Sequence, residues 1–108
     1  MNMNMIIQPR YNVKTRTTTF VGMGEENKGW TYGKSIADCY INSKGVDVYH
    51  KDGRFLLVGV TANSVKVTGV IRFSSRSELD LFLESYDDFD GRIQASGLSE
   101  LFDTISVN

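Results

Sequence analysis

Residues 46–73 carry the pattern that most limits the fold of this chain. Apolar and polar residues alternate over 46–50, and Asp52-Gly53 then separates them from a second apolar run at 54–60. Asp-Gly is favoured in type I′ hairpin turns because both central residues need a positive φ. The run at 54–60 is apolar on both faces, which is typical of a central strand. The pattern therefore predicts a three-stranded antiparallel meander.

The hydrophobic period changes after residue 74. Ser75 and Glu78 have the spacing of a capping box, in which each side chain bonds the other residue's backbone N–H at the start of a helix. Apolar residues then recur at helical spacing, which predicts helices at 76–89 and 98–105. Strands followed by helices predict an α+β fold, with both C-terminal helices packed on one face of the sheet.

The first half of the chain adds further strands. Residues 1–10 are polar and Met-rich and are expected to be loosely ordered. Residues 11–108 are then expected to form a single α+β domain. Residues 11–21 are rich in Thr and Val, which predicts one strand. Residues 30–41 fit either a strand or a helix, and we favour a strand.

The expected sheet thus has four to five antiparallel strands that bury one apolar core. The residues predicted to form this core are Val46, Val48, Phe55, Leu57, Val58, Val67, Ile71, Phe73, Leu79, Phe82, Leu83, Leu101 and Phe102.

Composition excludes several classes of protein. One Cys and one His among 108 residues provide neither a disulfide framework nor a multi-histidine metal site. We therefore expect no metal and no cofactor. No apolar run approaches the roughly 20 residues of a membrane span. The first ten residues also lack the basic and apolar regions of a signal peptide. These features predict a cytoplasmic chain without a membrane partner.

Charge is divided unequally along the chain. Residues 1–76 contain 11 of the 12 basic residues and 5 of the 13 acidic ones, a net charge of +6. Residues 77–108 contain eight acidic residues against Arg92, a net charge of −7. Such a division is typical of a chain with a charged contact surface, although the two halves could also simply neutralise each other.

The expected helix at 76–89 presents most of this acidic charge. At 100° per residue, its carboxylates fall opposite the apolar face, with one apolar side chain beside them. These residues are the candidate partner-binding site: Asp80, Leu81, Glu84, Asp87, Asp88 and Asp90. The sequence therefore predicts a small non-catalytic regulator or inhibitor that docks on a basic surface of another protein, either a host protein or a nucleoprotein complex. Small size without motifs is also typical of regulators that phages and mobile elements encode. The competing interpretation is a face that only keeps the helix solvated.

An alternative function uses the basic half of the chain. Single-stranded nucleic acid is bound by cations for the backbone and aromatic rings for the bases. The candidates are Lys14, Arg16, Trp30, Tyr32 and Lys34. An overall pI of about 5.7 and the lack of a known nucleic-acid motif oppose this alternative, and Trp30 could instead lie in the core.

Catalysis is not expected, because no set of acid, base, nucleophile or metal ligand stands out. A Cys39–His50 pair is the strongest enzymatic candidate, but a core cysteine and a histidine beside a turn explain these residues better. The strand at 11–21 could form a homodimer by edge pairing, although its Lys14 and Arg16 would also oppose such pairing.

Overall fold

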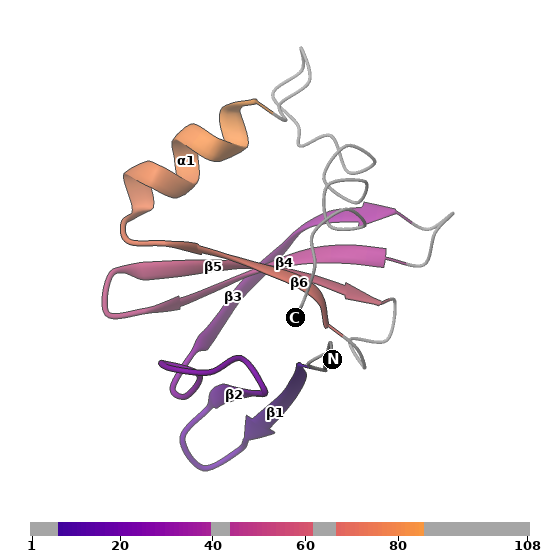
Figure 1. Ribbon diagram of the computed structural model, residues 1–108, viewed down its shortest axis with the longest axis vertical. Coiled ribbons are helices and arrows are strands. Elements are labelled where there is room, and N and C mark those ends of the chain that lie inside the picture. The colour runs from indigo at the N-terminus through magenta and orange to yellow at the C-terminus, as the bar shows by residue number, and fades with distance from the viewer. Residues whose placement is uncertain (1–6, 40–43, 62–66, 86–108) are drawn as a thin grey trace, which may run out of the picture.

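The computed structural model describes residues 7–39, 44–61 and 67–85, which form two antiparallel sheets and one helix (Figure 1). The elements are β1 (Gln8–Asn12), β2 (Thr17–Val21), β3 (Thr31–Cys39), β4 (Lys44–Lys51), β5 (Arg54–Thr61), β6 (Val67–Phe73) and α1 (Arg76–Glu84). The prediction of an antiparallel sheet followed by a helix is confirmed, and the described part of the chain is mostly β. The expected helix at 98–105 lies outside the described residues, as do 86–89.

The meander is confirmed and extended by one strand. The four-stranded sheet has the order β3-β4-β5-β6, and all neighbours are antiparallel. Asp52 and Gly53 have φ values of 49° and 80°, as a type I′ turn requires. β5 lies between β4 and β6, and its residues Leu56, Leu57 and Val58 are fully buried. The preference for a strand at 30–41 is also confirmed by β3.

The face that Val67 occupies differs from the expectation. Val67 was expected on the same side as Ile71 and Phe73, but it packs in the core on the opposite side of the sheet. The cause is a register shift: Gly59 pairs with Gly69, and Val60 pairs with Val67. One additional residue in β6 forms a bulge, which reverses the direction of every side chain before it.

Helix α1 covers one face of the four-stranded sheet. Leu79 of the helix packs there against Val46, Val48 and Leu57, and all four side chains are buried. The partly buried side chains around them are Ile36, Phe55, Ile71, Phe73, Phe82 and Leu83. The predicted core residues of this region are therefore confirmed as members of one cluster. Leu101 and Phe102 lie outside the described residues.

Residues 8–21 form a hairpin, so the prediction of one strand at 11–21 is wrong. β1 and β2 pair from Gln8↔Val21 to Asn12↔Thr17. The turn between them is closed by Asn12, whose Oδ1 accepts the backbone N–H of Lys14 at 2.9 Å and of Thr15 at 3.3 Å. Asn is a turn residue because its side chain imitates a backbone acceptor. The surrounding Thr and Val residues concealed this signal.

The hairpin covers the second face of the sheet, to which the sequence analysis assigned no covering element. Phe20 of β2 is fully buried with Trp30, Leu56 and Val58, and Ile7 joins the same cluster. Order therefore begins before Tyr11, because β1 starts at Gln8. In Figure 1 the hairpin and α1 lie on opposite sides of the four-stranded sheet. β1 is an edge strand among the described residues, and pairing of this edge between two copies stays a prediction.

Candidate interaction surfaces

The outer surface of α1 contains the described part of the predicted acidic site. Leu79 is 3% exposed and faces the sheet, whereas Leu81 is 66% exposed. Asp80 and Glu84 are exposed as well. The helix therefore separates an apolar inner face from an outer surface that has one leucine between carboxylates. Asp87, Asp88 and Asp90 lie outside the described residues.

The start of α1 is fixed by its predicted cap, with one difference. The Ser75 Oγ accepts the Glu78 backbone N–H at 3.2 Å, as expected for the capping box. The Glu78 carboxylate, however, accepts from Ser74, through its backbone N–H at 3.2 Å and its hydroxyl at 2.7 Å. Glu78 therefore holds the preceding turn.

Asp80 has a neighbour of opposite charge. The Arg76 Nε lies 3.4 Å from the Asp80 Oδ1, and both side chains are exposed. An exposed i,i+4 pair is weak, and a cation placed before the anion opposes the helix dipole. The guanidinium also lies 5.8 Å from the centre of the Phe55 ring. A partner's cation can therefore compete for Asp80 at small cost.

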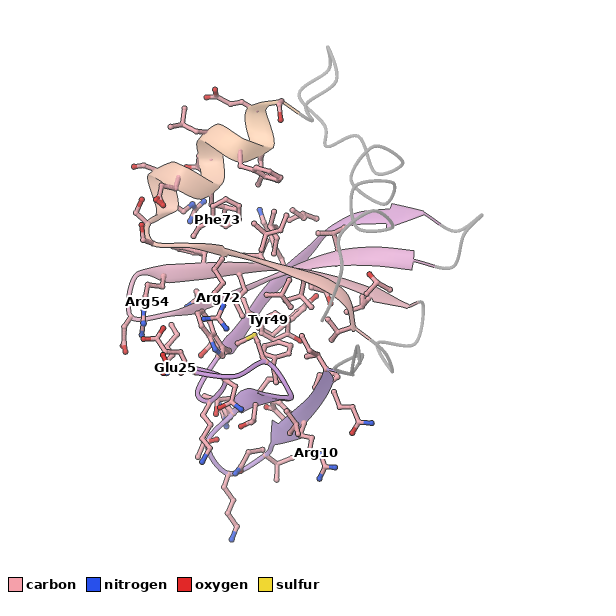
Figure 2. All side chains as sticks on the ribbon, viewed as in Figure 1. Arg10, Glu25, Tyr49, Arg54, Arg72 and Phe73 are labelled. Atoms are coloured by element: carbon pink, nitrogen blue, oxygen red, sulfur yellow. The ribbon has the colours of Figure 1, made fainter. Side chains whose placement is uncertain are left out.

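Positively charged side chains from three strands hold the loop at 22–29, an arrangement that the sequence analysis missed. Arg72 of β6 donates to the carbonyl oxygens of Met23 and Glu25, each at 3.3 Å. Lys51 of β4 donates to the Lys28 carbonyl at 2.8 Å. Figure 2 shows Arg54, Arg72 and Glu25 close together on the left of the view, at the end of the sheet where this loop lies. Part of the basic charge of residues 1–76 is therefore used within the fold.

The ion pair of this loop is Glu26 with Arg54 of β5, whose side chains share a hydrogen bond. That bond lowers the pKa of the Glu26 carboxyl. The carbonyl of Glu26 also accepts the Trp30 indole N–H at 2.6 Å. Spacing along the sequence could not have found this pair, because 28 residues separate its members.

An aromatic series runs from the edge of the sheet to its interior. Tyr32 contacts Tyr49 edge-on, with ring centres 5.5 Å apart, and Tyr49 contacts Phe20 in the same way at 4.8 Å. Figure 2 shows Tyr49 between the sheet and the hairpin. Burial raises the pKa of the Tyr49 hydroxyl, and the nearby Asp47 carboxylate raises it further. Asp47 is itself buried, which its position in an alternating strand did not predict.

The structure does not bring the five residues of the nucleic-acid alternative together. Trp30 is only 2% exposed, so its ring is part of the core and is not available for stacking. Tyr32 pairs with Tyr49, and Lys34 pairs with Val48, because the register shifts between these positions. Paired residues point to the same face, so Tyr32 lies on the hairpin side and Lys34 on the helix side.

The two remaining candidates of that alternative lie in the turn of the hairpin. Lys14 and Arg16 are both exposed, and Arg16 adopts a positive φ of 58°. The strand expected at 11–21 would have included both residues, which is wrong, because neither residue lies in a strand. Lys14 and Arg16 therefore lie at the surface of the hairpin turn, whereas Trp30 is buried beneath the hairpin.

The Cys39–His50 pair is separated by the register of the sheet. Thr31 pairs with His50, and Cys39 pairs with Lys44, so the two residues lie at opposite ends of the β3–β4 pair. The six residue steps along β4 from Lys44 to His50 correspond to about 20 Å. A nucleophile and its base need hydrogen-bond contact. This register therefore leaves the pair without the geometry for catalysis.

Among the described residues, no group of His, Cys, Asp and Glu could hold a metal ion. In the same part of the chain, no helix has the length and apolar character to cross a membrane. No family model, curated protein or solved structure matches this chain. The described structure thus defines a small, mostly-β domain with two charged surfaces, the outer surface of α1 and the β1–β2 hairpin.

Proposed function

We propose that this chain is a non-catalytic regulator that docks the outer surface of α1 on a basic surface of a partner protein. The observation that supports it best is the exposure of Leu81 between Asp80 and Glu84, on a helix whose inner face is already packed. Interfaces commonly combine one apolar anchor with a charged rim that steers association. Asp87, Asp88 and Asp90 would extend the same surface.

The fixed geometry of α1 supports the proposal. The helix is anchored by Leu79 and capped by Ser75, so its outer side chains are held in position before a partner arrives. Preorganised groups lose less entropy on binding than mobile ones. Exposed charges mainly raise the association rate, whereas a buried leucine mainly slows dissociation. The two residue types should therefore affect different rate constants.

The test begins with an affinity capture from host lysate that has been treated with nuclease, followed by kinetics with the purified partner. The Asp80→Lys/Glu84→Lys variant should slow association about 10-fold or more at low salt and reduce its salt dependence. The Leu81→Ser variant should mainly raise the dissociation rate. Glu25→Lys, which reverses one exposed carboxylate in the loop at 22–29, is the control for Asp80→Lys and Glu84→Lys taken singly, and it should leave both rates nearly unchanged.

The result that would overturn the proposal is equally specific. If the partner associates with the Asp80→Lys/Glu84→Lys variant as fast as with the wild type, the acidic surface is only a solvated helix face. If Glu25→Lys slows association as much as Asp80→Lys or Glu84→Lys alone, the effect comes from overall charge and α1 is not the docking site.

A further inference from the structure

The hairpin has an outer face that points away from the sheet. Phe20 and Thr18 of β2 are buried against the sheet. Because neighbouring residues in a strand point to opposite faces, Thr17 and Thr19 point outward. Cross-strand partners share a face, so the register assigns β1 residues to each side in the same way. The hairpin outer face consists of Gln8, Arg10, Asn12, Thr17, Thr19 and Val21.

The residue types on this face are those that recognise base edges. Arg pairs with guanine, Asn and Gln pair with adenine, and Thr contacts either polar base edges or the thymine methyl group. No acidic residue occurs between residues 7 and 24. Lys14 and Arg16 add two positive charges in the turn at the end of the hairpin.

The shape of the hairpin suits the same ligand. The major groove of B-form DNA is about 12 Å wide and accepts a two-stranded β-ribbon. The hairpin stands at one end of the molecule, and α1 lies on the other side of the four-stranded sheet (Figure 1). The exposed carboxylates of α1 therefore do not face a ligand that approaches the hairpin. Figure 2 shows the Arg10 side chain extending away from the body of the molecule.

The hairpin is also held firmly enough to present its side chains to base edges in a fixed position. Its turn is closed by Asn12, and the hydroxyls of Thr15 and Thr17 lie 2.8 Å apart in a hydrogen bond. β2 is joined to the start of β3 by two backbone bonds between Thr18 and Trp30, at 2.7 and 3.1 Å. A rigid element positions base-contacting side chains with less loss of entropy than a mobile loop.

We propose that the hairpin outer face binds duplex DNA in its major groove, with Arg10 at base edges and Lys14 and Arg16 on the phosphates. This site is independent of the outer surface of α1 and needs none of its residues. The turn residues contact the DNA phosphates and thereby fix the position of the hairpin on the duplex. The side chains of β1 and β2 contact the bases.

The first test measures binding of a labelled 20-base-pair DNA duplex by fluorescence anisotropy as salt is varied. The wild type should bind at low salt, with an affinity that falls steeply as salt rises. The Lys14→Gln/Arg16→Asn variant should reduce the slope of log affinity against log salt by about 2, because two phosphate contacts are lost. Asn is used at position 16 because it tolerates the positive φ.

Two further variants separate base contact from general charge. Arg10→Gln should weaken binding about 10-fold, because a base contact is lost together with the charge. Lys34→Gln removes the same charge on the helix side of the sheet and should change the affinity less than about 2-fold. Unchanged Trp30 emission in each variant confirms that the hairpin is still docked, since Trp30 is buried beneath it.

The choice of probe distinguishes the major groove from other anionic ligands. An RNA duplex of the same sequence should bind about 10-fold more weakly, because the A-form major groove is too narrow for the hairpin. Equal binding of RNA and DNA duplexes, or of polyglutamate, would overturn the proposal in favour of a nonspecific anion surface. Tighter binding of single-stranded DNA, reduced by Tyr11→Ala, would overturn it in favour of base stacking on the exposed Tyr11.

Discussion

The β1–β2 hairpin and helix α1 cover opposite faces of one sheet, but they are held to it in different ways. The helix is held mainly by apolar contacts around Leu79. The hairpin and the loop that follows it also depend on polar contacts, which include the Thr18–Trp30 backbone bonds and the cations that bind loop carbonyls. A helix satisfies most of its own backbone groups, whereas an irregular loop needs partners for them. The difference shows why the hairpin side has most of the described long-range polar contacts.

The hairpin and α1, which we call the two covers of the sheet, also differ in charge. The hairpin is basic, and the described outer surface of α1 has Asp80 and Glu84. The sheet between them keeps these charges on opposite sides of the molecule (Figure 1). Each surface can therefore bind a partner of opposite charge without interference from the other. Four predictions test how separate the two covers are.

The largest effect is expected on the hairpin side. Phe20→Ala removes a fully buried ring that packs against the sheet. The free energy of unfolding should fall by about 3–5 kcal/mol, as measured by urea denaturation. Val13→Ala is the control, because Val13 is 75% exposed in the turn and should change stability by less than about 0.5 kcal/mol. A loss below about 1 kcal/mol for Phe20→Ala would show that the hairpin contributes little to the core.

A smaller loss is expected on the helix side. Leu79→Ala should reduce the free energy of unfolding by an amount near the lower end of about 2–5 kcal/mol, because the partly buried side chains around its cluster, such as Phe82 and Leu83, can move to close the gap. The two clusters share no residue. The losses from Leu79→Ala and from Phe20→Leu should therefore add within about 0.5 kcal/mol in the double variant. A larger coupling would mean that the two covers are not independent.

Matched substitutions at the two turns compare how each cover begins. Ser75→Ala removes the side-chain acceptor at the start of α1, and Asn12→Ala removes the acceptor in the hairpin turn. Each should reduce the free energy of unfolding by about 1 kcal/mol in thermal or urea denaturation. Only Asn12→Ala should also weaken DNA binding, because Asn12 closes the hairpin turn and lies on the hairpin outer face, and equal effects of both variants on binding would contradict the separation of the two sides of the sheet.

The smallest effect at neutral pH concerns Tyr49. Burial raises the pKa of its hydroxyl in the folded state above that of the unfolded chain. As pH rises, the unfolded state therefore loses this proton first. The contribution of Tyr49 to the free energy of unfolding should be constant around neutral pH and should fall as pH rises above about 10. Tyr49→Phe should show a shallower fall in unfolding midpoint between pH 9 and 11. Identical pH profiles would show that Tyr49 does not titrate differently in the two states.

Parts of the fold could be predicted because their signals are local. Asp52-Gly53 specifies its own turn, and the Ser75 cap with the spacing of Leu79 specifies the start and inner face of α1. The candidate site on α1 followed from the same spacing, and Leu81 lies on the outer side as expected. The hairpin at 8–21 was missed because one asparagine marks its turn within a uniformly β-forming segment.

What the sequence determined by itself was the set of strands in the meander, the turn within it, the start of α1 and the division of charge. These depend on neighbours within a few residues, where sterics and hydrogen bonding act directly. Only the tertiary structure decided that Trp30 is buried, that Val67 changes face and that Glu26 meets Arg54. Such outcomes depend on contacts between segments that are distant in sequence, and the free energy of those contacts exists only after the sheet and its two covers have come together.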